Sequence, residues 1–352
     1  MNLASPGPSL LKWYAGHKRD LPWRHTNDPY TIWISEIILQ QTRVDQGLAY
    51  FHRFMDAYPQ VSDLAMAREE DVLKLWQGLG YYSRARNLHA TAKIIVTKHG
   101  GVFPQEYKEL LMLKGIGDYT ASAIASFAFN KPTAVLDGNV FRFLSRYYGI
   151  DTPIDSPEGK KEFGFLAASA IDTSDPGLYN QAIMEFGALQ CKPGTPDCPA
   201  CPLVGTCIAF ATSNVALLPV KSKKLKVRER FFNYLHIENK DAVLLNRRGI
   251  SDIWQGLYDF PILETNKSIG PDELMESAQW NLFFKDHSFK VKSVSKTFVH
   301  KLTHQKIQAV FYNIEMNELL PLVANTTFMV NKEVFEKYPI PRLIDLYLNS
   351  RI

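Results

Sequence analysis

"LKGIGDYTASAIASFAF", residues 113–129, is the stretch that decides the fold of the N-terminal part of the chain. Two glycines flank one isoleucine where one helical pattern ends and the next begins, so we expect two helices joined by a tight hairpin at Gly115 and Gly117. The second helix would start with unpartnered backbone N–H groups, and these suit a phosphate oxygen. Glycine also lets a polyanion backbone approach closely. An ordinary glycine-capped turn is the alternative.

Length and composition indicate a folded protein with more than one domain. The chain has 352 residues, of which 46% are hydrophobic and 22% charged, whereas a single domain usually has about 100–200 residues. No apolar run approaches the length needed to cross a bilayer, and residues 1–20 lack the charged-then-apolar layout of a signal peptide. We therefore expect a cytoplasmic monomer with no membrane partner.

Two patterns divide the chain. Residues 1–213 carry helical patterns joined by short Gly/Pro turns, whereas residues 231–352 alternate in the manner of strands and include two helical patterns. The intervening residues, 214–230, read as a basic linker that ends in "KSKKLKVRER". This block suits contact with a polyanion or a solvated connection equally well. The prediction is a mainly α N-terminal domain and a smaller α+β C-terminal domain.

All four cysteines of the chain fall within "CKPGTPDCPACPLVGTC", residues 191–207. Four clustered thiols in a chain expected to be cytoplasmic favour a metal site over disulfides. Six, two and five residues separate Cys191, Cys198, Cys201 and Cys207. Zinc accepts four sulfurs, but its usual ligand pattern is two CxxC pairs separated by a longer span. The spacing therefore favours a [4Fe–4S] cluster.

The hairpin, then "AVLDGNV" with Asp137, then the cysteine loop resemble in this order the helix-hairpin-helix DNA glycosylases that carry an iron–sulfur cluster. The resemblance covers nearly all of residues 10–210. Three further segments are similar to adenine DNA glycosylases of the MutY type: "LPWR" (21–24), "SEIILQQTRV" (35–44) and "GLGYYSRARNLH" (78–89). The resemblance implies an enzyme that removes adenine paired with 8-oxoguanine from double-stranded DNA.

The implied reaction needs one protonated and one ionised carboxyl, because the leaving base takes a proton while the sugar develops positive charge. Glu36 lies on a helix that Asp28 caps and Pro29 begins, and Ile32 and Trp33 precede it by one turn. An apolar face would raise the pKa of Glu36 and keep it protonated as the general acid. A surface glutamate of an amphipathic helix is the alternative.

Asp137 precedes a helical pattern and is expected at its N-cap, where backbone N–H groups would lower its pKa and keep it ionised. The resemblance implies that Asp137 stabilises the sugar cation and that Asn139 is a second polar residue of the pocket. Related glycosylases that also cut the strand carry a hairpin lysine, but this chain has Tyr119 there and no lysine between Lys114 and Lys131. We expect base excision without strand cleavage, with Tyr119 lining the pocket.

An enzyme that acts on a paired base must extrude it and fill the gap. By resemblance, Gln41 and Tyr81 are the inserted side chains, and Thr42 and Leu79 lie close to the opposite base. A tyrosine packed in the core is the alternative for Tyr81. Further DNA contacts are expected from the hairpin glycines, Arg24, Arg84 and Arg86, and the resemblance also carries over Gln181.

"LLNRRGISDIWQGLYDFP", residues 244–261, resembles part of a Nudix-type fold. Nudix hydrolysis needs a helix dense in glutamates for Mg²⁺, and the residues that follow lack it, so we expect a Nudix-like domain without hydrolase activity. "FVHKLTHQKIQAVF" resembles the lesion-recognition loop of the family, with Leu302, Thr303 and His304 where Phe-Ser-His is usual. Threonine retains the hydroxyl, whereas Leu302 lacks the aromatic ring. A solvated hairpin is the alternative.

Three other functions compete with this prediction. A glycosylase with lyase activity on oxidised pyrimidines needs the missing hairpin lysine. A non-catalytic DNA-binding protein with a zinc-filled cysteine loop gives Glu36 no role. Hydrolysis of free nucleotides needs the missing glutamate helix.

Overall fold

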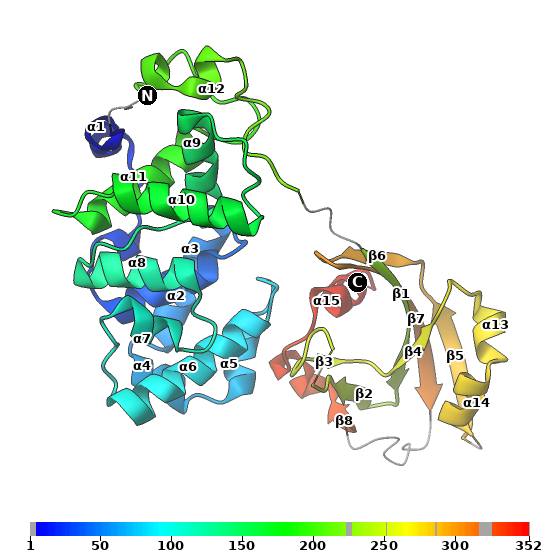
Figure 1. Ribbon diagram of the computed structural model, residues 1–352. Helices are drawn as coiled ribbons and strands as arrows, with labels where there is room; N and C mark the ends of the chain where they lie inside the picture. Colours follow the sequence, from blue (N-terminus) through cyan, green and yellow to red (C-terminus); the bar gives the residue numbers. More distant parts are fainter. Residues whose placement is uncertain (1–4, 223–226, 251, 286, 317–325, 352) are drawn as a thin grey trace. The chain divides into compact units, whose positions relative to one another are not determined.

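The computed structural model describes most of the chain: residues 5–222, 227–250, 252–285, 287–316 and 326–351. Within these ranges every helix is too short or too polar to pass through a bilayer. The chain forms two compact units, residues 1–66 with 87–223 and residues 67–86 with 224–352 (Figure 1). Residues 223–226 of the predicted basic linker lie outside the described residues.

The first unit is helical, as the sequence predicts. Asp28 caps α2 by accepting a hydrogen bond from the backbone N–H of Thr31 at 2.8 Å, and Pro29 is the first residue of that helix. Its elements are α1 (Gly7–His17), η1 (Pro22–Arg24), α2 (Pro29–Leu39), α3 (Val44–Ala57), α4 (Val61–Met66), most of α6 (Ser83–His99), α7 (Tyr107–Leu111), α8 (Asp118–Phe129), α9 (Gly138–Tyr148), α10 (Pro157–Ala170), α11 (Pro176–Leu189), η2 (Val204–Thr206) and α12 (Ile208–Ala211); α5 (Glu69–Leu75) groups with the second unit.

The predicted helix-hairpin-helix is present between α7 and α8. Gly115 has a φ of +78°, and a Cβ there would lie 2.6 Å from the Cβ of Asn87. Both facts require glycine. Gly117 differs, because it is the N-cap of α8 with a φ of −99° and open space around it. Gly115 therefore makes the turn, while Gly117 leaves the start of α8 uncovered.

One hydrophobic core holds the C-terminal helices of this unit together. α11 packs against α1, α8 and α9, and α2 packs against α8. Phe143 of α9 and Phe186 of α11 meet edge to face with their ring centroids 5.3 Å apart. These contacts fix the relative positions of α2, α8, α9 and α11, which carry the candidate site.

The second unit is α+β, as predicted. Its sheet has the order β3-β2-β1-β7-β5, with β4 on β1, β6 on β7 and β8 on β2. Only the β1–β7 pair is parallel among the described strands. The elements are β1 (Arg228–Glu238), β2 (Ala242–Arg247), β3 (Tyr258–Asp259), β4 (Ile262–Thr265), α13 (Pro271–Met275), α14 (Ala278–Phe284), β5 (Phe289–Val294), β6 (Phe298–Lys301), β7 (Gln305–Met316), β8 (Thr327–Asn331), η3 (Lys332–Lys337) and α15 (Arg342–Asn349).

The sheet is covered on both faces. On β1, Phe232 and Tyr234 belong to a core that includes Tyr347 of α15, whereas Leu235 belongs to a core that includes Trp280 of α14. Alternate residues of a strand point to opposite faces, so the two cores lie on opposite sides of the sheet. Figure 1 shows α15 on one side and α13 with α14 on the other.

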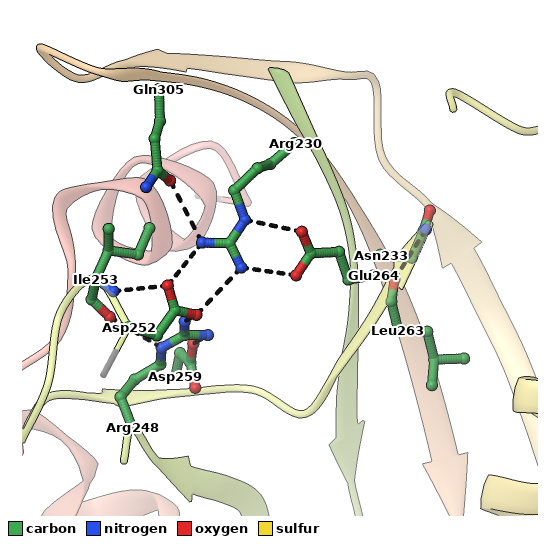
Figure 2. A network of polar contacts seen from close by, with 9 residues as sticks. All are labelled: Arg230, Asn233, Arg248, Asp252, Ile253, Asp259, Leu263, Glu264 and Gln305. Atoms are coloured by element: carbon green, nitrogen blue, oxygen red, sulfur yellow. Dashed lines mark hydrogen bonds and ion pairs between the residues drawn. The ribbon is translucent and has the colours of Figure 1, made fainter. Parts of the chain in front are cut away.

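A polar network anchors the loop that follows β2 (Figure 2). The guanidinium of Arg230 donates to both oxygens of Glu264, at 2.8 and 2.6 Å, and to both oxygens of Asp252, at 2.7 and 3.1 Å. Arg248 bonds Asp252 and the fully buried Asp259. Burial raises the pKa of Asp259 to about 7, although Arg248 acts against this shift. Each carboxylate of this network is thus held by arginine.

The two hairpin glycines predict different responses to alanine. Gly115→Ala should lower the free energy of unfolding by about 1–3 kcal/mol, because it forces a left-handed alanine against Asn87. Gly117→Ala is the matched control and should cost less than about 1 kcal/mol. Urea unfolding followed by helical circular dichroism measures both. Equal losses would show that the left-handed turn is not what fixes the hairpin.

Candidate active site

Glu36 lies on the inner face of α2 and is 6% exposed. The hydroxyl of Tyr119, on α8, donates a hydrogen bond to its Oε2 at 2.6 Å. Burial raises the pKa of Glu36 to about 7; the Tyr119 hydrogen bond and the charge of Arg24 oppose the shift, and the charge of Asp137 adds to it. The predicted direction is confirmed, and a carboxyl with this pKa keeps a proton near neutral pH.

Asp137 is the N-cap of α9, as predicted. Its carboxylate accepts three hydrogen bonds, from the backbone N–H of Asn139 at 2.9 Å, the backbone N–H of Val140 at 2.8 Å and Nδ2 of Asn139 at 2.6 Å. The predicted lowering of its pKa is wrong, because burial raises the pKa and outweighs these hydrogen bonds. A sequence shows the cap but not the depth at which the cap lies.

The hydrogen bonds decide which of the two carboxyls is ionised. Asp137 accepts three hydrogen bonds and also feels the positive charge of Arg142, whereas a single donor, Tyr119, is recorded for Glu36. Donors to a carboxylate favour its charged form. The charge on Asp137 in turn raises the pKa of Glu36. These contacts favour the proton on Glu36 and the negative charge on Asp137.

Tyr119 lies within electrostatic range of both carboxyls. Burial raises its pKa well above the usual value, and the charges of Glu36 and Asp137 raise it further. The phenol thus stays protonated and remains a donor. Its hydroxyl also lies 3.8 Å from the sulfur of Met184 on α11. Elements α2, α8, α9 and α11 thus contribute to one group of interacting side chains.

A further buried carboxylate, Glu185 on α11, was not predicted from the sequence. Glu185 is 1% exposed, and its two oxygens accept hydrogen bonds from Arg24, at 3.1 and 2.8 Å, and from Arg19, at 2.9 and 2.6 Å. Burial acts to raise the pKa of Glu185, but the arginines outweigh it and lower the pKa to about 2. One turn earlier, Gln181 accepts from the hydroxyl of Tyr14 at 2.8 Å. The signal was available, since Glu185 is a lone charge on an apolar helix.

Arg24 was predicted to contact DNA, but its guanidinium is held inside the protein by Glu185. Its NH1 also donates to the backbone carbonyl of Arg19 at 3.0 Å. Its charge lowers the pKa of Glu36, so it lies in electrostatic range of the carboxyl pair. The structure thus places Arg24 beside the pocket.

Asn139 links Asp137 to the cysteine loop. Its Oδ1 accepts a hydrogen bond from Arg142 at 2.8 Å, and Arg142 also donates to the carbonyl of Cys191 at 2.8 Å and to that of Gly187 at 2.6 Å. At Gly187 a Cβ would lie 2.7 Å from the carbonyl oxygen of Asn139. The close approach of α9 and α11 thus depends on this glycine.

The four cysteines are free thiols that line one small cavity with Phe143 and Phe186: Cys191, Cys198, Cys201 and Cys207. Burial raises the pKa of Cys201 to about 11. Arg146 points its NH1 at the sulfur of Cys191, 3.5 Å away. In the described part of the chain no three His, Cys, Asp or Glu side chains converge closely enough to hold a single ion. The four thiols thus line this cavity.

The residues predicted to enter DNA differ in exposure. Gln41 is exposed just after α2 with a φ of +57°, and Thr42 follows it. Tyr81 is 50% exposed with a φ of +47°, whereas Leu79 is 7% exposed. A left-handed backbone is unusual for these residue types and recurs at functional sites.

Arg84, which was predicted to meet phosphate, is buried. Its guanidinium donates to the carbonyl of Gly80 at 3.3 Å and lies 5.0 Å from the ring centroid of Trp76. Burial lowers its pKa to about 10. Arg84 therefore supports the turn that presents Tyr81.

The predicted lesion-recognition residues form the turn between β6 and β7. Thr303 and His304 are exposed, whereas Leu302 is partly buried against the core of the sheet. Within the second unit, the hydroxyls of Thr303 and Tyr81 are 2.6 Å apart. Two residues predicted to contact DNA thus lie together.

Comparison with known proteins agrees with this fold. Residues 34–164 match the model of the HhH-GPD superfamily base excision DNA repair proteins, and residues 233–350 match the NUDIX domain. A thermostable thymine-DNA glycosylase has a similar structure, with a TM-score of 0.55 and 29% identity, covering 58% of this chain and 94% of that chain. The first unit therefore belongs to the class of base-excision repair glycosylases.

Full-length relatives narrow the class. An adenine DNA glycosylase of Buchnera aphidicola subsp. Schizaphis graminum is 32% identical over 323 residues, which cover 92% of this chain and 88% of the relative. The human adenine DNA glycosylase is 43% identical over 210 residues, covering 57% of this chain and 38% of the relative. The chain belongs to the adenine DNA glycosylase family and is an enzyme. The resemblance inferred from its motifs is confirmed.

The Tyr119–Glu36 hydrogen bond predicts a shift in the pH profile. In the wild type, single-turnover release of adenine should fall as pH rises through about 7, because Glu36 loses its proton. Tyr119→Phe removes a donor that favours the carboxylate, so the pKa of Glu36 rises and the fall should move to higher pH. Tyr107→Phe, which removes a hydroxyl from Asp118 instead, is the matched control. A fall at unchanged or lower pH in Tyr119→Phe would contradict this assignment.

Proposed function

We propose that this glycosylase removes adenine paired with 8-oxoguanine, or with guanine, in duplex DNA by hydrolysis of the N-glycosidic bond. The observation that carries the proposal is the pair of carboxyls with opposite hydrogen-bonding environments, Glu36 and Asp137. Glycoside cleavage requires an acid on one side and an anion on the other.

In the proposed mechanism Glu36 gives its proton to a ring nitrogen of the extruded adenine. The electron pair of the broken C–N bond leaves with the base. The sugar then carries positive charge, which the Asp137 carboxylate stabilises. Asn139 and the backbone of α9 hold that carboxylate in place. Water adds to the sugar carbon, and its proton restores Glu36. No atom of the protein is consumed.

Tyr119 in place of the hairpin lysine supports base removal without strand cleavage. A Schiff base requires an amine, and a buried phenol with a raised pKa is neither an amine nor a ready nucleophile. Its contact with Glu36 instead supports a role in holding the acid. We assign Tyr119 to the pocket and not to a covalent step.

DNA contact is proposed for exposed residues of the first unit and for Tyr81 of the second unit. Gln41, Tyr81 and the uncovered start of α8 after Gly117 offer side chains and backbone donors to a duplex. Thr42 and Leu79 are proposed to lie near the opposite base. Leu79 requires a backbone contact, because its side chain is buried.

Lesion recognition is proposed for Thr303 and His304 of the second unit. Both are exposed on a turn, and a hydroxyl and an imidazole supply the donors and acceptors that distinguish 8-oxoguanine from guanine. Leu302 is proposed to support the turn through its packing. Hydrolysis of free nucleotides receives no support, since Asp252, Asp259 and Glu264 are committed to arginines (Figure 2).

We propose that Cys191, Cys198, Cys201 and Cys207 hold a [4Fe–4S] cluster. The donor set fits, because four thiols line one cavity. Metal binding would ionise the thiols despite their burial. Four protein ligands leave no open position, so the cluster would supply structure: it would fix the loop to which Arg142 and Arg146 bond.

Replacing the acid tests the proposed function. Glu36→Gln should abolish adenine release from a duplex containing adenine opposite 8-oxoguanine, by at least about 100-fold, because glutamine has no proton to give. Binding to the same duplex should persist. Glu162→Gln, on the exposed side of α10, is the matched control. Full activity of Glu36→Gln would remove Glu36 from the proposed role.

The metal content tests the proposed cofactor. Protein purified without oxygen should be coloured and carry about four irons per chain, since the cysteine loop supplies four thiolates. Cys198→Ser should lose iron, colour and thermal stability together. A colourless protein with one zinc per chain would contradict the cluster and favour the zinc alternative.

A further inference from the structure

The sequence around the lesion-recognition turn is strongly basic. Residues 287–314 contain five lysines and no aspartate or glutamate. They form β5, β6 and most of β7, three neighbouring strands of the sheet. A one-sided basic segment is typical of contact with a polyanion.

Not all of these lysines are equally available. Lys292 pairs with Glu315 at 2.6 Å, and Lys306 pairs with Glu229 at 2.7 Å. Lys296 is exposed between β5 and β6, and the ammonium of this lysine pairs with no residue in the part of the chain that the structure describes. Its charge is therefore free for a ligand.

Lys296 lines a cavity of about 360 Å³. Its walls carry Ser293, Ser295 and Phe298, and Arg351 lines it from the C-terminal side. α15, which ends at Asn349, packs against β6 and brings Arg351 to this position. The hydroxyl of Ser295 donates to the carbonyl of Lys296, so the two cations are what suits this hollow to an anion.

Arg351 is held in place. Its NH2 donates to Glu238 at 3.3 Å, and its NH1 lies 2.7 Å from Nδ1 of His236. Burial lowers the pKa of His236 to about 3. The imidazole is therefore neutral and can accept a hydrogen bond from Arg351. A guanidinium has five N–H donors, so these two partners leave others for the cavity.

We propose that this cavity seats a phosphodiester group of the DNA whose lesion the Thr303–His304 turn reads. The inference rests on the proposed lesion recognition and deepens it. Phosphate contacts set the register of a protein on a duplex, while base contacts read the sequence. A fixed phosphate would thus hold the turn against the base pair.

Strand β6 determines the distance between the two contacts. It runs from Phe298 at the cavity to Lys301 at the turn. The three residue steps from Phe298 to Lys301 span about 10 Å, and a DNA strand rises about 3.4 Å per nucleotide. The seated phosphate should therefore lie roughly three nucleotides from 8-oxoguanine.

A salt titration measures the contact. All variants are made in the Glu36→Gln background, so that the duplex with adenine opposite 8-oxoguanine is not cleaved. Lys296→Ala should reduce the slope of log K against log salt by about one, as expected for one lost phosphate contact. Lys306→Ala removes the same charge from the same strands, but from a lysine paired with Glu229, and should leave the slope unchanged. Equal slopes in the two variants would overturn the proposal.

A phosphate scan locates the contact. Single neutral methylphosphonates are placed at each of about six positions on either side of 8-oxoguanine. One or two positions roughly three nucleotides away should weaken binding by about fivefold or more, and Lys296→Ala should be insensitive to those same positions. If Lys296→Ala is as sensitive as its parent at every position, the cavity holds no phosphate. Because binding is measured without cleavage, a wild type that releases no adenine would refute the proposed function and leave this result intact.

Discussion

The electrostatic relation between two neighbouring carboxyls is the constraint on which the rest of the active site depends. Glu36 is buried and Asp137 is half-buried, and the charge of Asp137 raises the pKa of Glu36. Three donors fix the negative charge on Asp137, and a single hydroxyl, from Tyr119, faces Glu36. This difference in hydrogen bonding stabilises the two carboxyls in the folded protein. It also favours Glu36 as the acid and Asp137 as the anion.

The helices around the pair serve this arrangement. α9 presents its N-terminus to Asp137, and α11 comes close enough to α9 for Gly187 to be required. Arg142 then ties both helices to the cysteine loop. Glu185 forms ion pairs with Arg19 and Arg24. The charge of Arg24 also acts on Glu36 and lowers its pKa. The buried charge of Glu185 is thus paired with two arginines.

Local signals carried most of the sequence-based prediction. The cap at Asp28, the hairpin at Gly115 and the N-cap at Asp137 depend on neighbours in the chain, and the structure has each of them. The raised pKa of Glu36 also follows from its helical face. The alternating strand pattern of residues 231–352 predicted the sheet of the second unit. Because alternate residues point to opposite faces, the same pattern explains the two covered faces.

Features that depend on tertiary contact were not predictable. The direction of the Asp137 pKa shift was wrong because its burial is set by tertiary packing, which the local sequence does not show. Glu185 was missed because its arginines lie more than 160 residues away. Arg84 resembled a phosphate contact because two arginines followed a glycine turn, but its guanidinium folds back onto that turn. A charged residue in a sequence does not show which way it points.

Difference infrared spectroscopy tests the central claim most directly, because it observes the carboxylic acid itself. The spectrum of the wild type minus that of Glu36→Gln should contain the carbonyl band of a protonated acid below neutral pH, and the band should disappear as pH rises through about 7. The spectrum of the wild type minus that of Asp137→Asn should show a carboxylate over the same range. A protonated band that vanishes in Asp137→Asn but persists in Glu36→Gln would place the proton on the wrong residue and contradict the account.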